Sequence, residues 1–87
     1  MRVVILYRKN GEHASDVEDV LREYKRRQSR ELETVDVDSV QGSQIAQLYG
    51  VTSYPAIIVS AVDGSLQKMW QGFPMPLIDE LAYYDNL

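Results

Sequence analysis

Two short runs of apolar residues constrain the fold of this chain more than any other feature. They are residues 3–6, Val-Val-Ile-Leu, and residues 56–59, Ala-Ile-Ile-Val. β-Branched residues favour strands, and a strand that is apolar at every position is expected to be covered on both faces. The chain is therefore predicted to be an α/β protein in which helices flank a sheet.

A helix is predicted to begin at Ser15. Ser15 can serve as its N-cap, and Glu18 three residues later completes a capping box. Apolar residues then recur at the spacing of one helical stripe, at Val17, Val20, Leu21 and Tyr24. The basic run at residues 25–27 complements the negative end of the helix dipole, so it is interpreted as a solvated helix end and not as an anion site.

A second strand and a second helix follow. Residues 34–38 alternate between polar and apolar types, which predicts a strand with Val35 and Val37 facing a core. The apolar stripe of the next helix consists of Ile45, Leu48 and Tyr49. Gly50 is expected to end this helix in the left-handed conformation.

A hairpin and a final helix complete the pattern. Asp63-Gly64 is a two-residue signal for a tight turn, and residues 66–70 supply the returning strand. Pro76 suits the first turn of a helix, whose apolar stripe consists of Leu77, Ile78, Leu81 and Tyr84. The order β-α-β-α-β-β-α predicts a four-stranded mixed sheet flanked by three helices, in a single domain at residues 1–87.

Composition excludes several classes of function. The chain has 87 residues, no cysteine, and a net charge of -4 from 13 acidic and 9 basic residues. Without cysteine it has no disulfide, no thiolate nucleophile and no Cys-ligated metal site.

The acidic balance argues against nucleic acid and anionic membranes as partners. No apolar run approaches the roughly 20 residues of a membrane span. The N-terminal run is too short for a signal peptide, so we expect a cytoplasmic protein.

Three motifs resemble a known family. The first is the alternating strand at residues 35–38. The second is residues 49–56, Tyr-Gly-Val-Thr-Ser-Tyr-Pro-Ala, which lead into a buried strand. The third is Asp63-Gly64 in the hairpin, followed by residues 70–72, Trp-Gln-Gly, before the last helix. In this order they resemble the thioredoxin superfamily, over nearly the whole chain. The size is closest to small glutaredoxin-like members. The resemblance implies a thioredoxin-like fold with a cis peptide bond before Pro55.

The resemblance also locates the family's redox pair, which this chain lacks. Residues 7–11, Tyr-Arg-Lys-Asn-Gly, are similar to the stretch that precedes Cys-x-x-Cys in glutaredoxin-like members. By that alignment Glu12 stands where the nucleophilic cysteine would be, and Ser15 where the resolving one would be. Neither side chain can exchange disulfides, which implies a redox-inactive domain. We interpret the pair as a structural cap, with Glu12 keeping a negative charge at the helix N-terminus.

A binding cleft beside the proline loop is a further implication of the resemblance. The expected cleft residues are Lys9, His13, Ser53, Tyr54 and Pro55. The loop backbone can pair with an extended segment, so the leading expectation is a protein or peptide partner. The alternative is a small-ligand module of the glutathione type, without thiol chemistry, in which Lys9 resembles a glutathione-contacting lysine. An aromatic rim around the cleft is one alternative, made of Tyr54, Trp70, Phe73, Pro74 and Met75. Of these, Tyr54 is expected to be exposed, whereas core positions under the last helix are favoured for Trp70 and Phe73.

No catalytic or metal centre is predicted. Glu12, His13 and Ser15 are neighbours on one loop, and such neighbours rarely reach the geometry of nucleophile, base and orienting group. One histidine with scattered carboxylates does not meet the ligand count of a zinc site. Asp36 and Asp38 could crowd a hard cation, but alternating strand aspartates are more often the solvent-facing set. We therefore expect an interaction module without a cofactor, and not an enzyme.

Overall fold

Two central strands organise the sheet. The computed structural model describes residues 1–87. Its elements follow the predicted order: β1 (Arg2–Tyr7), α1 (Ala14–Gln28), β2 (Glu33–Asp36), α2 (Val40–Tyr49), β3 (Ala56–Ser60), β4 (Leu66–Gln71) and α3 (Ile78–Asp85). The strands lie in the order β2-β1-β3-β4, with β1 and β2 parallel and the other neighbours antiparallel. The predicted α/β fold with a four-stranded mixed sheet is confirmed.

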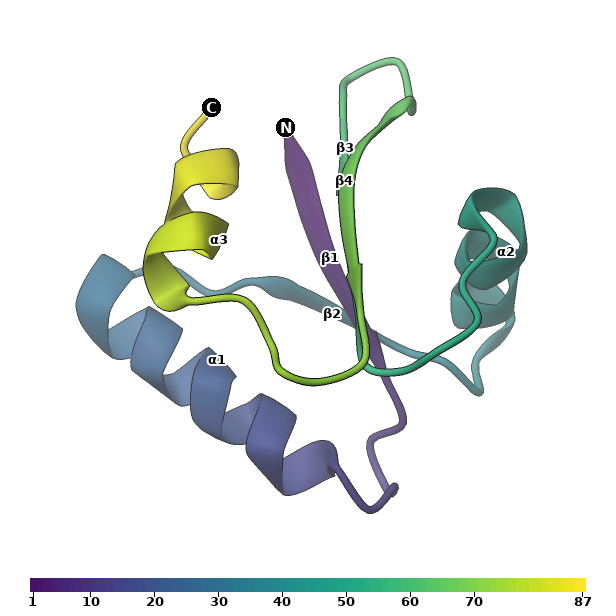
Figure 1. Ribbon diagram of the computed structural model, residues 1–87, viewed down its shortest axis with the longest axis horizontal. Helices are drawn as coiled ribbons and strands as arrows, with labels where there is room; N and C mark the ends of the chain where they lie inside the picture. The colour runs from purple at the N-terminus through teal and green to yellow at the C-terminus, as the bar shows by residue number, and fades with distance from the viewer.

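Helices cover both faces of the sheet (Figure 1). On one face, α1 and α3 pack over a core whose fully buried members are Ile5, Val17, Tyr24, Ile57, Val59 and Leu81. On the other face, α2 packs over a smaller core that consists of Val4, Leu6, Val35, Ala56 and Ile58. Both apolar runs are therefore covered on two sides, as the sequence predicts.

The start of α1 differs from the prediction. The helix begins at Ala14, one residue before Ser15, and His13 is its N-cap residue without a side-chain cap hydrogen bond. Ser15 is an exposed residue of the first turn, so the predicted capping box of Ser15 and Glu18 is wrong. The early start buries Ala14 in the core. A cap is worth on the order of 1 kcal/mol, which core burial at the same turn can match.

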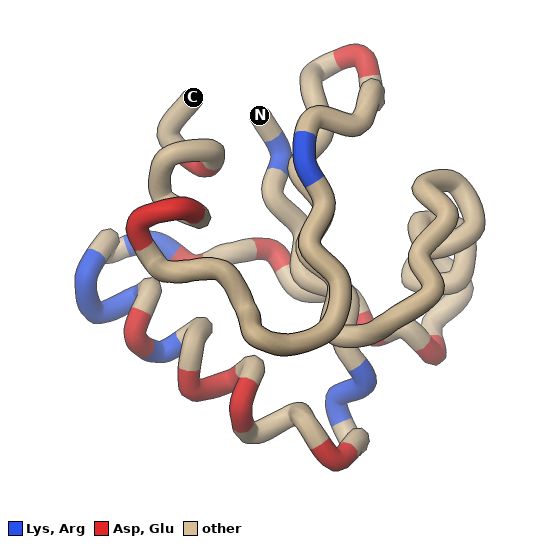
Figure 2. The backbone as a smooth tube through the Cα atoms, viewed as in Figure 1, with Lys and Arg blue, Asp and Glu red and all other residues tan.

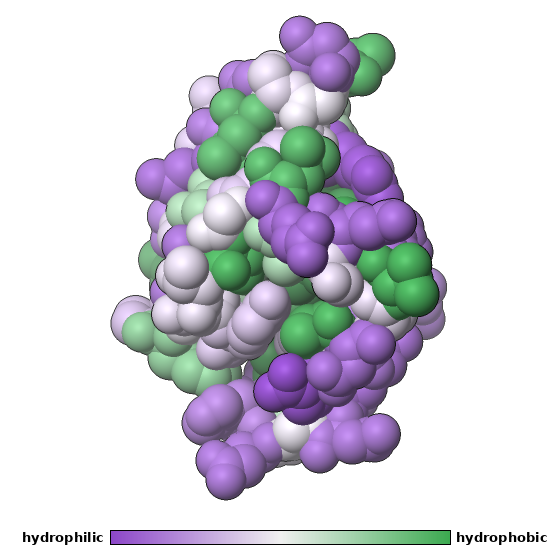
Figure 3. Space-filling model, turned by 90° about the vertical axis from the view of Figure 1, so that its right-hand side faces the viewer, coloured by the Kyte–Doolittle hydropathy of each residue, from purple (hydrophilic) through white to green (hydrophobic).

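The apolar stripes of α2 and α3 are narrower than predicted. Leu48 is 73% exposed and Leu77 is 71% exposed, so neither belongs to a core. Leu77 precedes the first turn of α3, which starts two residues after Pro76, and its N–H donates to Glu80 Oε1 at 3.1 Å. In Figure 3, which faces α2, apolar side chains form separate groups between polar ones. None of the three helices is long and apolar enough to cross a membrane.

A close backbone approach seats α2 against the end of β2. Ser39 is the N-cap of this helix, and its Oγ accepts a hydrogen bond from the Gly42 N–H at 3.0 Å. A Cβ at Gly42 would lie 2.1 Å from the Asp36 carbonyl oxygen. Only glycine fits at that distance. At the other end, Gly50 adopts the predicted left-handed conformation, with φ 67°.

Charges concentrate on α1, whereas α2 carries none (Figure 2). The basic run at residues 25–27, in the last turn of α1, is paired with nearby carboxylates. Arg26 and Arg27 pair with Glu23, and Lys25 pairs with Glu31 at 2.8 Å. The hydrogen bonds from Arg26 and Arg27 lower the pKa of the Glu23 carboxyl to about 2. This supports the interpretation of the run as a solvated helix end.

A partly buried hydrogen bond joins α1 to α3. The Tyr24 side chain is fully buried, and its hydroxyl donates to Asp85 Oδ2 at 2.6 Å. Arg30 lies 3.6 Å from the same carboxylate. Burial, together with the bond to Asp85, raises the pKa of Tyr24 well above its usual range.

Tyr24→Phe should lower the free energy of unfolding at neutral pH. It should also make that free energy fall less steeply with pH in the alkaline range. At neutral pH the lost bond to a carboxylate should cost about 2 kcal/mol in urea unfolding. In the unfolded chain Tyr24 loses its proton near pH 10, while the raised pKa of the folded state keeps it protonated. Stability therefore falls as pH rises above about 10, by up to about 1.4 kcal/mol per pH unit from this group. A variant that loses stability as steeply as the wild type above that pH would contradict this.

Gly42→Ala should cost about 3 kcal/mol, because the new methyl group must push α2 away from the end of β2. Ser43→Ala is the matched control: it makes the same methyl side chain one residue later on an exposed position, and should leave stability within about 0.5 kcal/mol of the wild type. Both values come from urea unfolding. Equal stability of the two variants would show that the close approach at Asp36 does not constrain the fold.

Candidate binding cleft

One wall of the candidate cleft is the turn between β1 and α1. The chain reverses direction there, with the Gly11 N–H donating to the Arg8 carbonyl at 2.9 Å and the Ala14 N–H to the Gly11 carbonyl at 3.3 Å. This turn brings Glu12 and His13 to the start of α1. No side chain caps that end of the helix, so first-turn N–H groups of α1 are left for other acceptors.

The opposite wall is the segment before β3. The Tyr54–Pro55 peptide bond is cis, and so is Phe73–Pro74 in the next loop. Pro55 is buried, and its carbonyl accepts from the Gly72 N–H at 2.8 Å. Tyr54 is half-buried and packs against the core under α2, so it is less exposed than predicted.

Gln71, at the end of β4, holds this wall in place. Its Oε1 accepts hydrogen bonds from the Thr52 N–H at 2.7 Å and the Ser53 N–H at 3.1 Å. One amide oxygen thus satisfies two successive backbone donors just before Tyr54. The sequence analysis quoted Gln71 only as part of the Trp-Gln-Gly motif and gave it no role in the cleft, because no local pattern shows that its side chain reaches residues 52 and 53.

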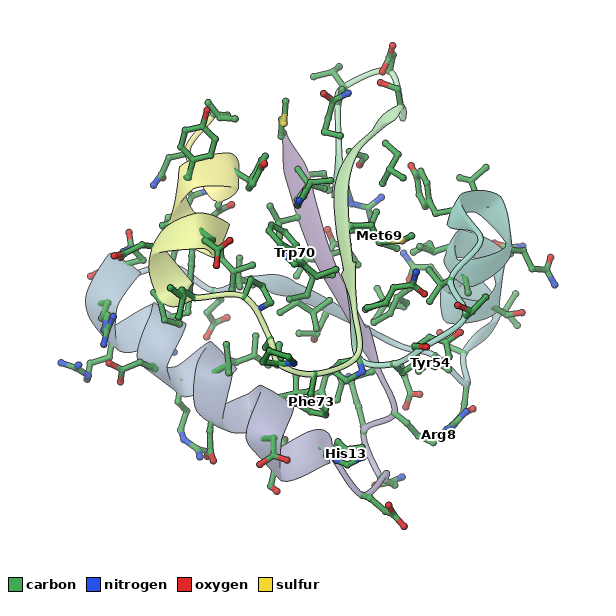
Figure 4. All side chains as sticks on the ribbon, in the orientation of Figure 1. Arg8, His13, Tyr54, Met69, Trp70 and Phe73 are labelled. Atoms are coloured by element: carbon green, nitrogen blue, oxygen red, sulfur yellow. The ribbon has the colours of Figure 1, made fainter.

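An aromatic contact joins His13 of the cleft to the loop after β4. The rings of His13 and Phe73 meet edge to face, with centroids 5.0 Å apart and planes at 66°. Phe73 is 44% exposed, so its predicted place in the core is wrong. Trp70 is half-buried against the core beside α3, as predicted. Figure 4 shows His13 and Phe73 close together at the same end of the molecule as Arg8 and Tyr54.

Between these walls lies a cleft of about 550 Å³. It brings together four of the predicted site residues: Glu12, His13, Tyr54 and Pro55. The other three, Lys9, Ser15 and Ser53, are exposed and do not line it. The lining adds residues that the sequence analysis did not assign to the cleft, namely Tyr7, Arg8, Asn10, Gly11, Ala14 and Val17.

The electrostatics of the cleft are mixed. Arg8 makes bidentate hydrogen bonds to Asp38, with Nε–Oδ2 at 2.9 Å, and these bonds raise the pKa of the guanidinium. Both partners are more than half exposed, so the pair adds little stability and the guanidinium remains accessible. Burial, assisted by Glu18 and Asp36, raises the pKa of the Tyr7 hydroxyl at the base of the cleft. The cleft therefore offers one cation, one carboxylate and aromatic surface.

Comparison with known proteins bears on the fold. A scan against protein-family models and a search of curated proteins found no match. Among solved structures, thioredoxin 1 from the thermophilic eubacterium Thermosipho africanus TCF52B is similar over 99% of this chain and 91% of its own, with a TM-score of 0.63 and 12% sequence identity. The fold is thioredoxin-like. At that identity the similarity concerns the fold alone.

This thioredoxin-like fold carries no cysteine anywhere in the chain. Thiol–disulfide exchange requires a thiolate, so no residue of this chain can supply that chemistry. Nor does the structure bring together three or more histidine or carboxylate side chains that could hold a metal ion. The cleft can therefore offer hydrogen bonds, charge and apolar contact to a ligand.

Gln71→Ala should loosen the wall before Tyr54 without unfolding the sheet. Loss of the shared acceptor leaves the Thr52 and Ser53 amides without their partner, so their hydrogen exchange, followed by NMR, should accelerate by at least about tenfold. Gln67→Ala on the same strand is the control and should leave both rates unchanged. Retained protection at both amides in Gln71→Ala would show that the loop is held by other contacts.

Proposed function

We propose that this chain is a redox-inactive thioredoxin-like domain that binds an extended segment of a partner protein. The segment would lie between the turn at residues 8–13 and the Tyr54–Pro55 wall. The observation that carries the proposal is the cleft of about 550 Å³ that joins Glu12 and His13 to Tyr54 and Pro55. In this chain the cleft exists without any thiol, so its use is binding and not redox chemistry.

The lining of the cleft suits a peptide. Tyr7, His13 and Tyr54 provide aromatic surface, and binding sites concentrate their energy on such residues. Arg8 and Glu12 provide one charge of each sign at the same cleft, which can orient a polar backbone and its side chains. The uncapped start of α1 adds backbone donors for a carbonyl or carboxylate of the ligand.

The wall at residues 52–55 suits an extended ligand in particular. Gln71 fixes this loop from behind, so its conformation is set before a ligand arrives. Rigid loops lose little entropy on binding, and an extended segment can form hydrogen bonds with such a backbone in the manner of an added strand.

A small ligand of the glutathione type is the second candidate. Its support is the size of the cleft, which falls within the roughly 300–1,000 Å³ typical of small-molecule sites. In that case Arg8, which lines the cleft, would contact the anionic ligand, in place of the exposed Lys9.

Selection from a random peptide library tests the proposal, with the best sequence then titrated into labelled protein by NMR. Shifts should cluster at His13, Tyr54 and Phe73, and Tyr54→Asp should weaken binding by at least about tenfold, as expected for a central aromatic contact. Leu48→Asp is the matched control. It introduces the same charge at an exposed position of α2, outside the cleft, and this variant should bind as the wild type does.

A parallel titration with reduced glutathione separates the two candidates. Saturable shifts in the cleft with glutathione, and no peptide selected, would favour the small-ligand module. Peptides that bind Tyr54→Asp as tightly as the wild type would overturn the proposed site.

A further inference from the structure

A second groove lies between β4 and α3, on the sheet face that α1 and α3 cover. Its volume is about 390 Å³, and it is lined by Lys68, Trp70, Asp79, Glu80, Tyr83 and Tyr84. In Figure 4 Trp70 lies between β4 and α3 near the middle of the view, whereas Arg8, His13 and Tyr54 lie in its lower part. None of its lining residues belongs to the cleft described above.

Three aromatic rings form this groove. Trp70 and Tyr84 meet edge to face with centroids 5.6 Å apart, and Tyr83 meets Tyr84 in the same manner at 5.1 Å. Tyr84 and Trp70 are anchored against the core, while Tyr83 is 63% exposed. Anchored rings present fixed faces to a ligand at low entropic cost.

The charges of the groove favour a cation. Asp79 and Glu80, in the first turn of α3, place two carboxylates at its rim against a single basic residue, Lys68. The Lys68 Nζ already lies 5.5 Å from the centre of the Trp70 ring. Aromatic faces attract cations through their quadrupole, so the chain's own ammonium shows which charge this surface prefers.

We propose that this groove binds a lysine or arginine side chain from an extended basic segment of a partner protein. The incoming cation takes the place of the Lys68 ammonium over Trp70, and the carboxylates of Asp79 and Glu80 pair with it. A net charge of -4 on the whole chain attracts a partner of this kind.

The position of β4 explains why the ligand is an extended segment and not a free small cation. β4 is the outer strand of the sheet, with only β3 beside it. An extended segment can add to such an edge through backbone hydrogen bonds. Alternate side chains of the added strand then lie on the same face as Lys68 and Trp70, next to the groove.

Fluorescence of Trp70, the only tryptophan in the chain, reports on this site directly. The probe is a capped threonine-rich peptide with arginine at alternate positions, and the control peptide has citrulline in place of arginine. The arginine peptide should change the emission saturably, and raising the salt from about 20 mM to about 300 mM should weaken binding, because charge pairs at a surface are screened. The citrulline peptide should bind at least about threefold more weakly.

Variants of the full chain then test each part of the groove. Asp79→Asn with Glu80→Gln should weaken binding by at least about threefold, while Glu18→Gln, a charge loss on exposed α1, should change it less. Lys68→Ala frees the Trp70 face and should strengthen binding by about two- to fivefold, whereas Lys9→Ala removes a distant positive charge and should not.

Three results would overturn the proposal: equal binding of the citrulline peptide, an unchanged Kd for the double carboxylate variant, or unchanged binding in Lys68→Ala. Thermal melts of each variant show whether it is folded before it is titrated. The groove shares no lining residue with the cleft at Tyr54. Tyr54→Asp should therefore leave binding of the arginine peptide unchanged.

Discussion

The fold depends on burying β1 and β3 from both sides. Ile5 and Leu6 on β1, and Ile57 and Val59 on β3, are almost completely removed from solvent, and full burial of such side chains is worth about 1.5–3 kcal/mol each. Because neighbouring residues of a strand point to opposite faces, no single layer of helices could satisfy this requirement. The placement of α1 and α3 on one face and α2 on the other follows from it.

Elements that respond to this burial were predictable from sequence. The stripe of α1, the two central strands and the left-handed Gly50 all follow from local periodicity or backbone chemistry, and all are found. The failures have a different cause. Leu48 is apolar and at helical spacing, yet α2 meets the sheet on too small a surface to cover it. Ser15 is a good N-cap residue, but burial of its neighbour Ala14 moves the helix start.

The candidate site was predictable only in part, because its geometry depends on contacts between distant segments. Glu12, His13, Tyr54 and Pro55 were found through a resemblance that gave their order along the chain. Gln71 and Phe73 reach the same region from β4 and the loop after it, and no local pattern shows that Gln71 bonds to residues 52 and 53 or that the Phe73 ring meets His13. Lys9 and Arg8 are adjacent basic residues, and only the direction of the turn decides which of them lines the cleft.

The two successive residues at the end of β4 face opposite sides of the sheet. Trp70 pairs with Ile57 and belongs to the face under α3, whereas Gln71 pairs with Ala56 and reaches the loop before Tyr54. A rigid strand cannot move one of them without the other. One strand end therefore holds both surfaces in place: Trp70 lines the aromatic groove, while Gln71 and the Gly72 N–H, which donates to the Pro55 carbonyl, hold the proline loop on the other side.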